Sequence, residues 1–118
     1  MEIQDIEEWS EIRWWSDYEV STLGNVRRMK DGKILKKYTQ KSGYEAVYLK
    51  KNGWVSAVMV HRLVAETFLP RIKDKEYVDH INTIRNDNRL ENLRWASHYD
   101  NANNETTKIN RRKWRITK

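Results

Sequence analysis

Short runs of alternating apolar and polar residues occupy the first half of the chain and predict β-strands. Residues 17–29 read as two strands joined at Leu23-Gly24-Asn25. Residues 44–49 and 54–60 are β-prone runs on either side of Asn52-Gly53, the dipeptide most typical of a tight hairpin turn. The pattern predicts an antiparallel sheet of three to five short strands.

The spacing changes near residue 60. Apolar side chains at helical spacing predict a short amphipathic helix over residues 61–69, which Pro70 closes. Two further strands are expected at residues 77–81 and 90–96, separated by a polar stretch. The sequence Ser-His-Tyr-Asp at 97–100 matches a capping box and predicts a helix from about residue 98 towards residue 112.

These elements predict an α+β fold, in which a small antiparallel sheet precedes a strand–loop–strand–helix unit. We expect a β-rich segment at residues 1–58, the second unit at 59–105 and a basic tail at 106–118. The 118 residues are 38% hydrophobic and contain no cysteine, which excludes disulfides and thiolate zinc sites. No apolar run approaches the roughly 20 residues that a membrane span needs, and the acidic N-terminus does not resemble a signal peptide.

Charge is distributed unevenly. The net charge of +6 equals the six Lys and Arg residues of the tail, while residues 1–105 carry equal numbers of basic and acidic residues. Residues 27–51 add nine Lys and Arg against two acids. Clustered cations favour a nucleic-acid partner because phosphates attract them together. A solvated surface with a disordered basic end is the alternative.

Chemically reactive side chains gather on the strand–loop–strand–helix unit. Asp79 and Asn101 offer hard oxygen ligands, which suit Mg²⁺. His80 can accept a proton from water near neutral pH. Each of these residues also has a purely structural interpretation. His80 could only form a structural hydrogen bond, Asp79 could cap a turn, and Asn101 could be solvated. Asn92, at the start of the second strand, could be a turn former.

The unit resembles the HNH endonucleases, in particular the phage and intron-encoded homing enzymes. Residues 60–70 are similar to the helix that opens this family's nuclease unit, and residues 78–82, 88–95 and 97–101 are similar to its motif. Residues 8–27 resemble the nuclease-associated modular (NUMOD-type) DNA-binding segment fused to these enzymes. The resemblance covers residue 7 to about residue 104.

The resemblance implies a ββα-metal (HNH) finger at residues 77–112. It implies that Asp79 and Asn101 hold one Mg²⁺ or Mn²⁺ ion, and that His80 is the general base. Asn92 would hydrogen-bond across the loop and hold His80 in line. His98 would make a secondary contact near the phosphate, unless it is only a solvated residue at a helix start.

The implied function is hydrolysis of duplex DNA, as a nick or a double-strand break, leaving 5′-phosphate and 3′-hydroxyl ends. We expect double-stranded DNA as the partner, no membrane, no small-molecule cofactor, a monomer or weak dimer, and a cytoplasmic location in a phage-infected or prokaryotic cell. The basic side chains expected to contact DNA are Arg27, Arg28, Lys30, Lys33, Lys36, Lys50, Lys51, Arg111 and Arg112.

The alternative function is a DNA-binding module that does not cleave. For His61, a structural hydrogen bond is favoured over catalysis, and a zinc site of His61, His80 and His98 is disfavoured.

The sequence departs from the family pattern at two places. Arg13-Trp14-Trp15 replaces a Pro-Gly turn after Ile12, and Asn82-Thr83 replaces Asp-Gly in the loop after His80. The longer homing enzymes add a C-terminal helix-turn-helix, so a long recognition site is not expected here.

Overall fold

The computed structural model describes residues 6–102. It contains two three-stranded antiparallel sheets, a central helix and a two-stranded sheet followed by a short helix. The elements are β1 (Trp9–Ile12), β2 (Trp15–Ser21), β3 (Val26–Arg28), β4 (Tyr38–Thr39), β5 (Glu45–Lys51), β6 (Trp54–Met59), α1 (Val60–Phe68), β7 (Tyr77–His80), a 3₁₀ turn (Leu90–Asn92), β8 (Leu93–Ala96) and α2 (His98–Ala102).

The first sheet has the order β1-β2-β3. The two strands predicted over residues 17–29 are confirmed as β2 and β3, with Gly24 in the turn at a φ of 83°. Alternation places Tyr18 and Val20 in the core. The sequence did not predict β1, whose four residues have no clear alternation.

The second sheet has the order β4-β5-β6, and the predicted hairpin forms its larger part. Asn52 and Gly53 both have positive φ values, 51° and 83°, as a tight type I′ turn requires. Val47 and Leu49 point into the core, whereas Tyr48 and the first four residues of β6 are exposed. The strands therefore form two sheets rather than the single sheet that was predicted.

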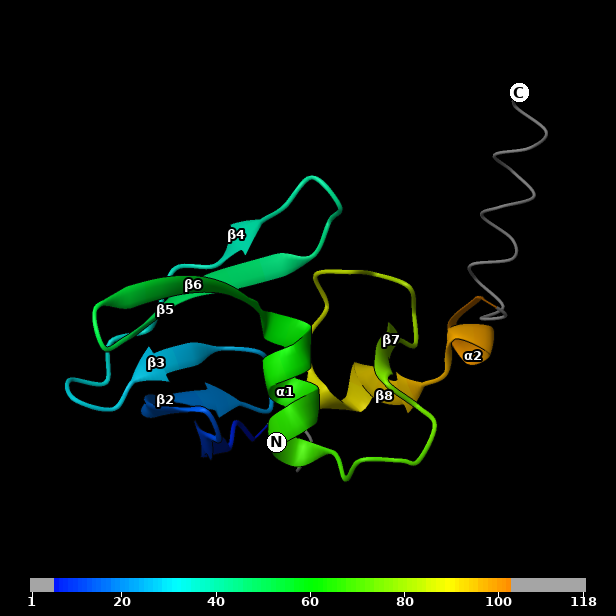
Figure 1. The fold of residues 1–118 in the computed structure, drawn as a ribbon, viewed down its shortest axis with the longest axis horizontal. Coiled ribbons are helices and arrows are strands. Elements are labelled where there is room, and N and C mark those ends of the chain that lie inside the picture. Colours follow the sequence, from blue (N-terminus) through cyan, green and yellow to red (C-terminus); the bar gives the residue numbers. More distant parts are fainter. Residues whose placement is uncertain (1–5, 103–118) are drawn as a thin grey trace.

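Helix α1 lies at the centre of the molecule, between the strands of the first half and the β7–β8 hairpin (Figure 1). It begins one residue before the prediction and ends at Phe68, because Leu69 is extended ahead of Pro70. Val60, Leu63 and Val64 are almost completely buried. Buried apolar residues from both expected segments form one core around this helix.

Strands β7 and β8 pair antiparallel and carry α2 after them. The capping box is confirmed: the Ser97 amide donates to Asp100 Oδ2 (3.2 Å), and the Asp100 amide donates to Ser97 Oγ (3.0 Å). The predicted strand at 90–96 is wrong in its first three residues. These form a 3₁₀ turn, since the Leu90 amide donates to the Thr22 carbonyl (2.8 Å) instead of pairing within the hairpin.

Within residues 6–102, no helix is long and apolar enough to cross a membrane. The expected continuation of α2 to residue 112, and the basic tail, lie outside the described residues.

His61 on α1 is buried, with 9% of its surface exposed. Its Nδ1 has no hydrogen-bond partner among the described residues, so this nitrogen does not make the structural hydrogen bond that the sequence favoured. Burial, together with smaller contributions from the charges of His80 and Arg62, lowers the pKa of His61 from 6.5 to about 4. The folded protein therefore keeps the His61 ring neutral above about pH 4.

We expect the stability of the protein to fall as the pH drops from about 6.5 to about 4. The unfolded chain protonates His61 near pH 6.5 and the folded chain only near pH 4, so the contribution is complete above 6.5 and is lost between these values. Two and a half pKa units correspond to about 3 kcal/mol. Urea unfolding at several pH values would measure this, and His61→Phe should flatten the profile.

His98→Gln, at an exposed position, serves as the matched control and should leave the acid sensitivity unchanged. An unaltered pH profile in His61→Phe would contradict this account of the buried ring.

Thr83 adopts a φ of 62°, in the left-handed region where the family pattern places glycine. This conformation costs about 1–2 kcal/mol for a residue with a Cβ atom, whereas glycine adopts it freely at an unfolded-state cost of about 0.5–1 kcal/mol. We therefore expect Thr83→Gly to raise the free energy of unfolding by about 1 kcal/mol in denaturant titration. Asn52→Gly is the control: asparagine tolerates its φ of 51°, so a smaller gain is expected. If Thr83→Gly lowers the free energy of unfolding instead, the claim that the Thr83 backbone is strained is wrong.

Candidate active site

The catalytic candidates lie at the end of β7. Asp79 and His80 are both buried, with 3% and 5% of their surfaces exposed. Opposite them on β8 are Arg94 and Leu93. Asp79 Oδ2 accepts a hydrogen bond from Arg94 Nε at 2.8 Å, so this buried carboxylate has a cationic partner. A carboxylate and an imidazole are thus adjacent on one strand beside the polar loop.

The His80 ring is fixed from two directions. Its Nε2 is 2.7 Å from Asn88 Oδ1, a residue of the loop that separates β7 from β8. Its ring also packs against His61 and Tyr44, with centroid distances of 5.1 and 5.8 Å. The base candidate therefore has a defined orientation before any substrate binds.

Asn92 forms the hydrogen bonds across the loop that the family resemblance implied. Its Nδ2 donates to Asn82 Oδ1 (2.9 Å) and to the Asp87 carbonyl (2.8 Å), and its Oδ1 accepts from the Asn82 amide (3.1 Å). The side chain that contacts His80 is Asn88 rather than Asn92. Asn92 thus closes the loop, while another asparagine orients the imidazole.

Arg89 also stabilises the loop. It donates two hydrogen bonds to Asp87, at 2.8 and 2.9 Å. This pairing, with a further hydrogen bond from Asn82, lowers the pKa of Asp87 to about 2. The carboxylate is therefore ionised at neutral pH and keeps the loop closed.

Asn101 lies in α2, which packs against β7 and β8, so the fold brings its backbone near the strand that carries Asp79. The Asn101 side chain lies outside what the structure describes. Among the described residues, no three His, Cys, Asp or Glu side chains form a metal-binding group. A carboxylate and an amide oxygen are ligand types that suit a hard divalent ion, and the pairing of Asp79 with Asn101 in such a site stays a prediction.

His98 is exposed at the start of α2, and its ring lies 5.8 Å from that of Tyr77. It is therefore accessible to a substrate, and its role stays a prediction. The three-histidine zinc site also stays disfavoured, although His61 and His80 do lie together.

The basic residues of the first segment fall into two groups. Arg27 donates to Glu19 (2.9 Å) and lies over the Trp9 ring, and Arg28 is paired with Asp31 (2.7 Å). All five lysines that were expected to contact DNA are exposed: Lys30, Lys33, Lys36, Lys50 and Lys51. Of these, Lys51 Nζ also donates to the Trp14 carbonyl at 3.1 Å. Arg111 and Arg112 lie outside the described residues.

Three residues of the site were not predicted from the sequence: Tyr44, Glu45 and Asn88. Glu45 Oε1 accepts from Asn88 Nδ2 at 3.1 Å, across 43 residues of sequence. Arg85 donates to the Ser42 carbonyl, and its guanidinium lies over Tyr44. No local pattern signals such pairs, although Asn88 does belong to a stretch that resembles the family motif.

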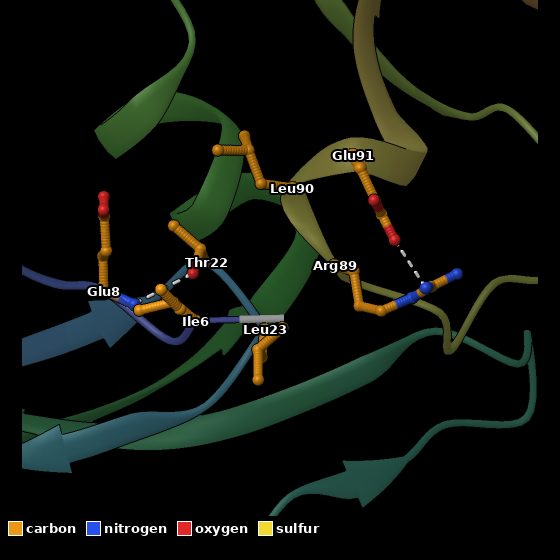
Figure 2. Close-up of a pocket in the computed structure, with 7 residues that line it drawn as sticks. All are labelled: Ile6, Glu8, Thr22, Leu23, Arg89, Leu90 and Glu91. Carbon is orange, nitrogen blue, oxygen red and sulfur yellow. Dashed lines mark hydrogen bonds and ion pairs between the residues drawn. The ribbon is translucent and has the colours of Figure 1, made fainter. Parts of the chain in front are cut away.

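A cavity of about 260 Å³ lies where the N-terminal segment meets the 3₁₀ turn, and Figure 2 shows the side chains around it. None of the proposed catalytic or metal-binding residues lines it. Its lining consists of Ile6, Glu8, Thr22, Leu23, Arg89, Leu90 and Glu91.

Two families of known proteins match successive segments of this chain. Residues 58–103 match the HNH endonuclease family, and residues 7–54 match the NUMOD4 motif. DNA endonuclease I-HmuI of Bacillus phage SP01 is 35% identical over 102 residues, covering 86% of this chain and 59% of that protein. An uncharacterized HNH endonuclease of Acanthamoeba polyphaga mimivirus is 34% identical over 102 residues, covering 86% of this chain and 31% of that protein.

A solved structure described as DNA binding and cleavage by the HNH homing endonuclease I-HmuI superposes with a TM-score of 0.78 at 32% identity. The match covers 92% of this chain and 65% of that one, so this chain spans less than two thirds of the relatives it matches. The fold predicted from the sequence is confirmed by this similarity. By both of its motifs and by its fold, the chain belongs to the HNH endonuclease family, with a NUMOD4 motif preceding the nuclease unit.

Proposed function

We propose that this chain is a metal-dependent DNA endonuclease that hydrolyses phosphodiester bonds of duplex DNA. The observation that carries the proposal is the buried pair Asp79 and His80 at the end of β7, with the His80 ring oriented by Asn88. The relative from Bacillus phage SP01 is named a DNA endonuclease, and the similar structure is described as binding and cleaving DNA.

In the proposed reaction, His80 takes a proton from the water that attacks the scissile phosphorus. Asp79 and Asn101 would hold one Mg²⁺ or Mn²⁺ ion, which when bound neutralises the phosphate and stabilises the departing 3′ oxygen. Asn92 keeps the loop beside the base closed. The products would be a 5′-phosphate and a 3′-hydroxyl.

Duplex DNA is the proposed partner, with phosphates contacted by the exposed lysines of the first segment. Lys30 and Lys33 follow β3, while Lys50 and Lys51 lie at the end of β5. Arg27 and Arg28 each have a carboxylate partner already, so the lysines are the stronger candidates. The monomeric or weakly dimeric state and the cytoplasmic location stay predictions.

We expect nicking of supercoiled plasmid in Mg²⁺ or Mn²⁺ and no nicking in excess EDTA. The reason is the oxygen-only ligand pair, which prefers hard cations and should use zinc poorly. Gel electrophoresis of the plasmid measures the outcome, with a gel shift run in parallel. DNA binding without nicking in any of these ions would favour a non-cleaving binding module, and full activity in EDTA would exclude the metal mechanism.

We expect His80→Ala to slow nicking by about 10²–10⁴-fold, the usual contribution of a general base. DNA affinity should change only a few-fold, because a general base acts in proton transfer and contributes little to neutralising the phosphate. His98→Ala is the matched control at an exposed histidine of the same unit, and its loss should be smaller. Nicking by His80→Ala at the rate of the unmodified protein would refute the assignment.

A further inference from the structure

Three polar side chains from both halves of the molecule form a continuous chain of hydrogen bonds that ends at His80. Glu45 at the start of β5 accepts from Asn88 Nδ2 at 3.1 Å. Asn88 Oδ1 lies 2.7 Å from His80 Nε2. Asn88 and His80 are buried, so little water competes for these bonds.

The Glu45 carboxylate, at one end of this hydrogen-bond network, determines which atom donates in each of its hydrogen bonds. An ionised carboxylate can only accept hydrogen bonds, so Glu45 must face the amide nitrogen of Asn88. The carbonyl oxygen of Asn88 is then directed at His80, and it too can only accept. His80 Nε2 must therefore carry the ring proton, which leaves the lone pair of a neutral ring on Nδ1.

Asn88 is also fixed through its backbone. A Cβ atom on Gly24 would lie 3.0 Å from both the Cβ and the carbonyl oxygen of Asn88, which is closer than ordinary van der Waals contact, and the φ of +83° at this position also favours glycine. Two residues further on, the Leu90 amide donates to the Thr22 carbonyl. The turn between β2 and β3 therefore supports the same asparagine that Glu45 contacts from the second sheet.

We propose that Glu45 and Asn88 are positioning residues for His80: they select the tautomer with the proton on Nε2, so that Nδ1 is the nitrogen that accepts the proton of water. The inference rests on the proposed function in taking His80 as the base. It makes the NUMOD4 segment, which supplies Glu45 and Gly24, part of the active site, in addition to the DNA contacts proposed above for its lysines.

The test is a long-range ¹H–¹⁵N NMR spectrum of the full chain labelled in its histidine rings, at a pH where the rings are neutral. The His80 signals are assigned from their loss in His80→Gln. We expect one tautomer, with Nε2 protonated and Nδ1 unprotonated. A rapidly averaged mixture, or the opposite tautomer, in the unmodified protein would overturn the proposal.

Two single variants disrupt the hydrogen bonds that orient His80, and a double variant restores them. Asn88→Ala removes the acceptor but keeps the Cβ atom packed against Gly24, and Glu45→Gln removes the group that fixes the amide direction. Both should shift His80 towards a mixture of tautomers. In the double variant with Glu45→Gln and Asn88→Asp, the carboxylate moves next to His80 and can accept from both neighbours, so the single tautomer should return. Glu66→Gln, at an exposed residue of α1, is the control and should change nothing.

In nicking assays, Asn88→Ala should lower kcat by about 100-fold, the lower end of what a general base contributes, with KM unchanged. The double variant should recover most of this loss. If the variants keep the single tautomer, the proposal is wrong even when His80→Ala abolishes nicking. If the tautomers respond as expected but no metal supports nicking, the proposed function fails while the hydrogen-bond chain stands.

Discussion

The buried face of α1 is the constraint on which the rest of the structure depends. The helix packs against β1, β2, β5 and β6 on one side and against β7 and β8 on the other. Each fully buried Leu or Val side chain contributes about 1.5–3 kcal/mol, and the buried core around this helix takes residues from both halves of the chain. The core therefore joins the NUMOD4 segment and the nuclease unit into one body.

The polar contacts around the site depend on that shared core. The loop after β7 has few apolar residues of its own, and it is held by partners that the first half supplies: Thr22 for Leu90, and Gly24 and Glu45 for Asn88. Because the packing of α1 keeps these partners in place, the imidazole of His80 is oriented without substrate. Such preorganisation is what positioned acid–base chemistry requires.

The features predicted correctly from the sequence are those that neighbouring residues determine. The Asn52-Gly53 hairpin, the periodicity of α1 and the capping box at Ser97 are all local signals, and each corresponds to an observed element. Contacts between distant residues carry no such signal. The bond between Glu45 and Asn88 spans 43 residues, and neither the 3₁₀ turn at Leu90 nor the strand β1 has a periodic pattern.

The central claim, that both segments form a single body, is tested most directly by urea unfolding followed residue by residue with ¹H–¹⁵N NMR. The amide signals of Val20 in β2 and Leu93 in β8 report the two halves, and both residues lie in the core. We expect both folded-state signals to disappear with one midpoint that coincides with the loss of far-ultraviolet circular dichroism. Loss of the Leu93 signal at a clearly different urea concentration from that of Val20 would contradict the account.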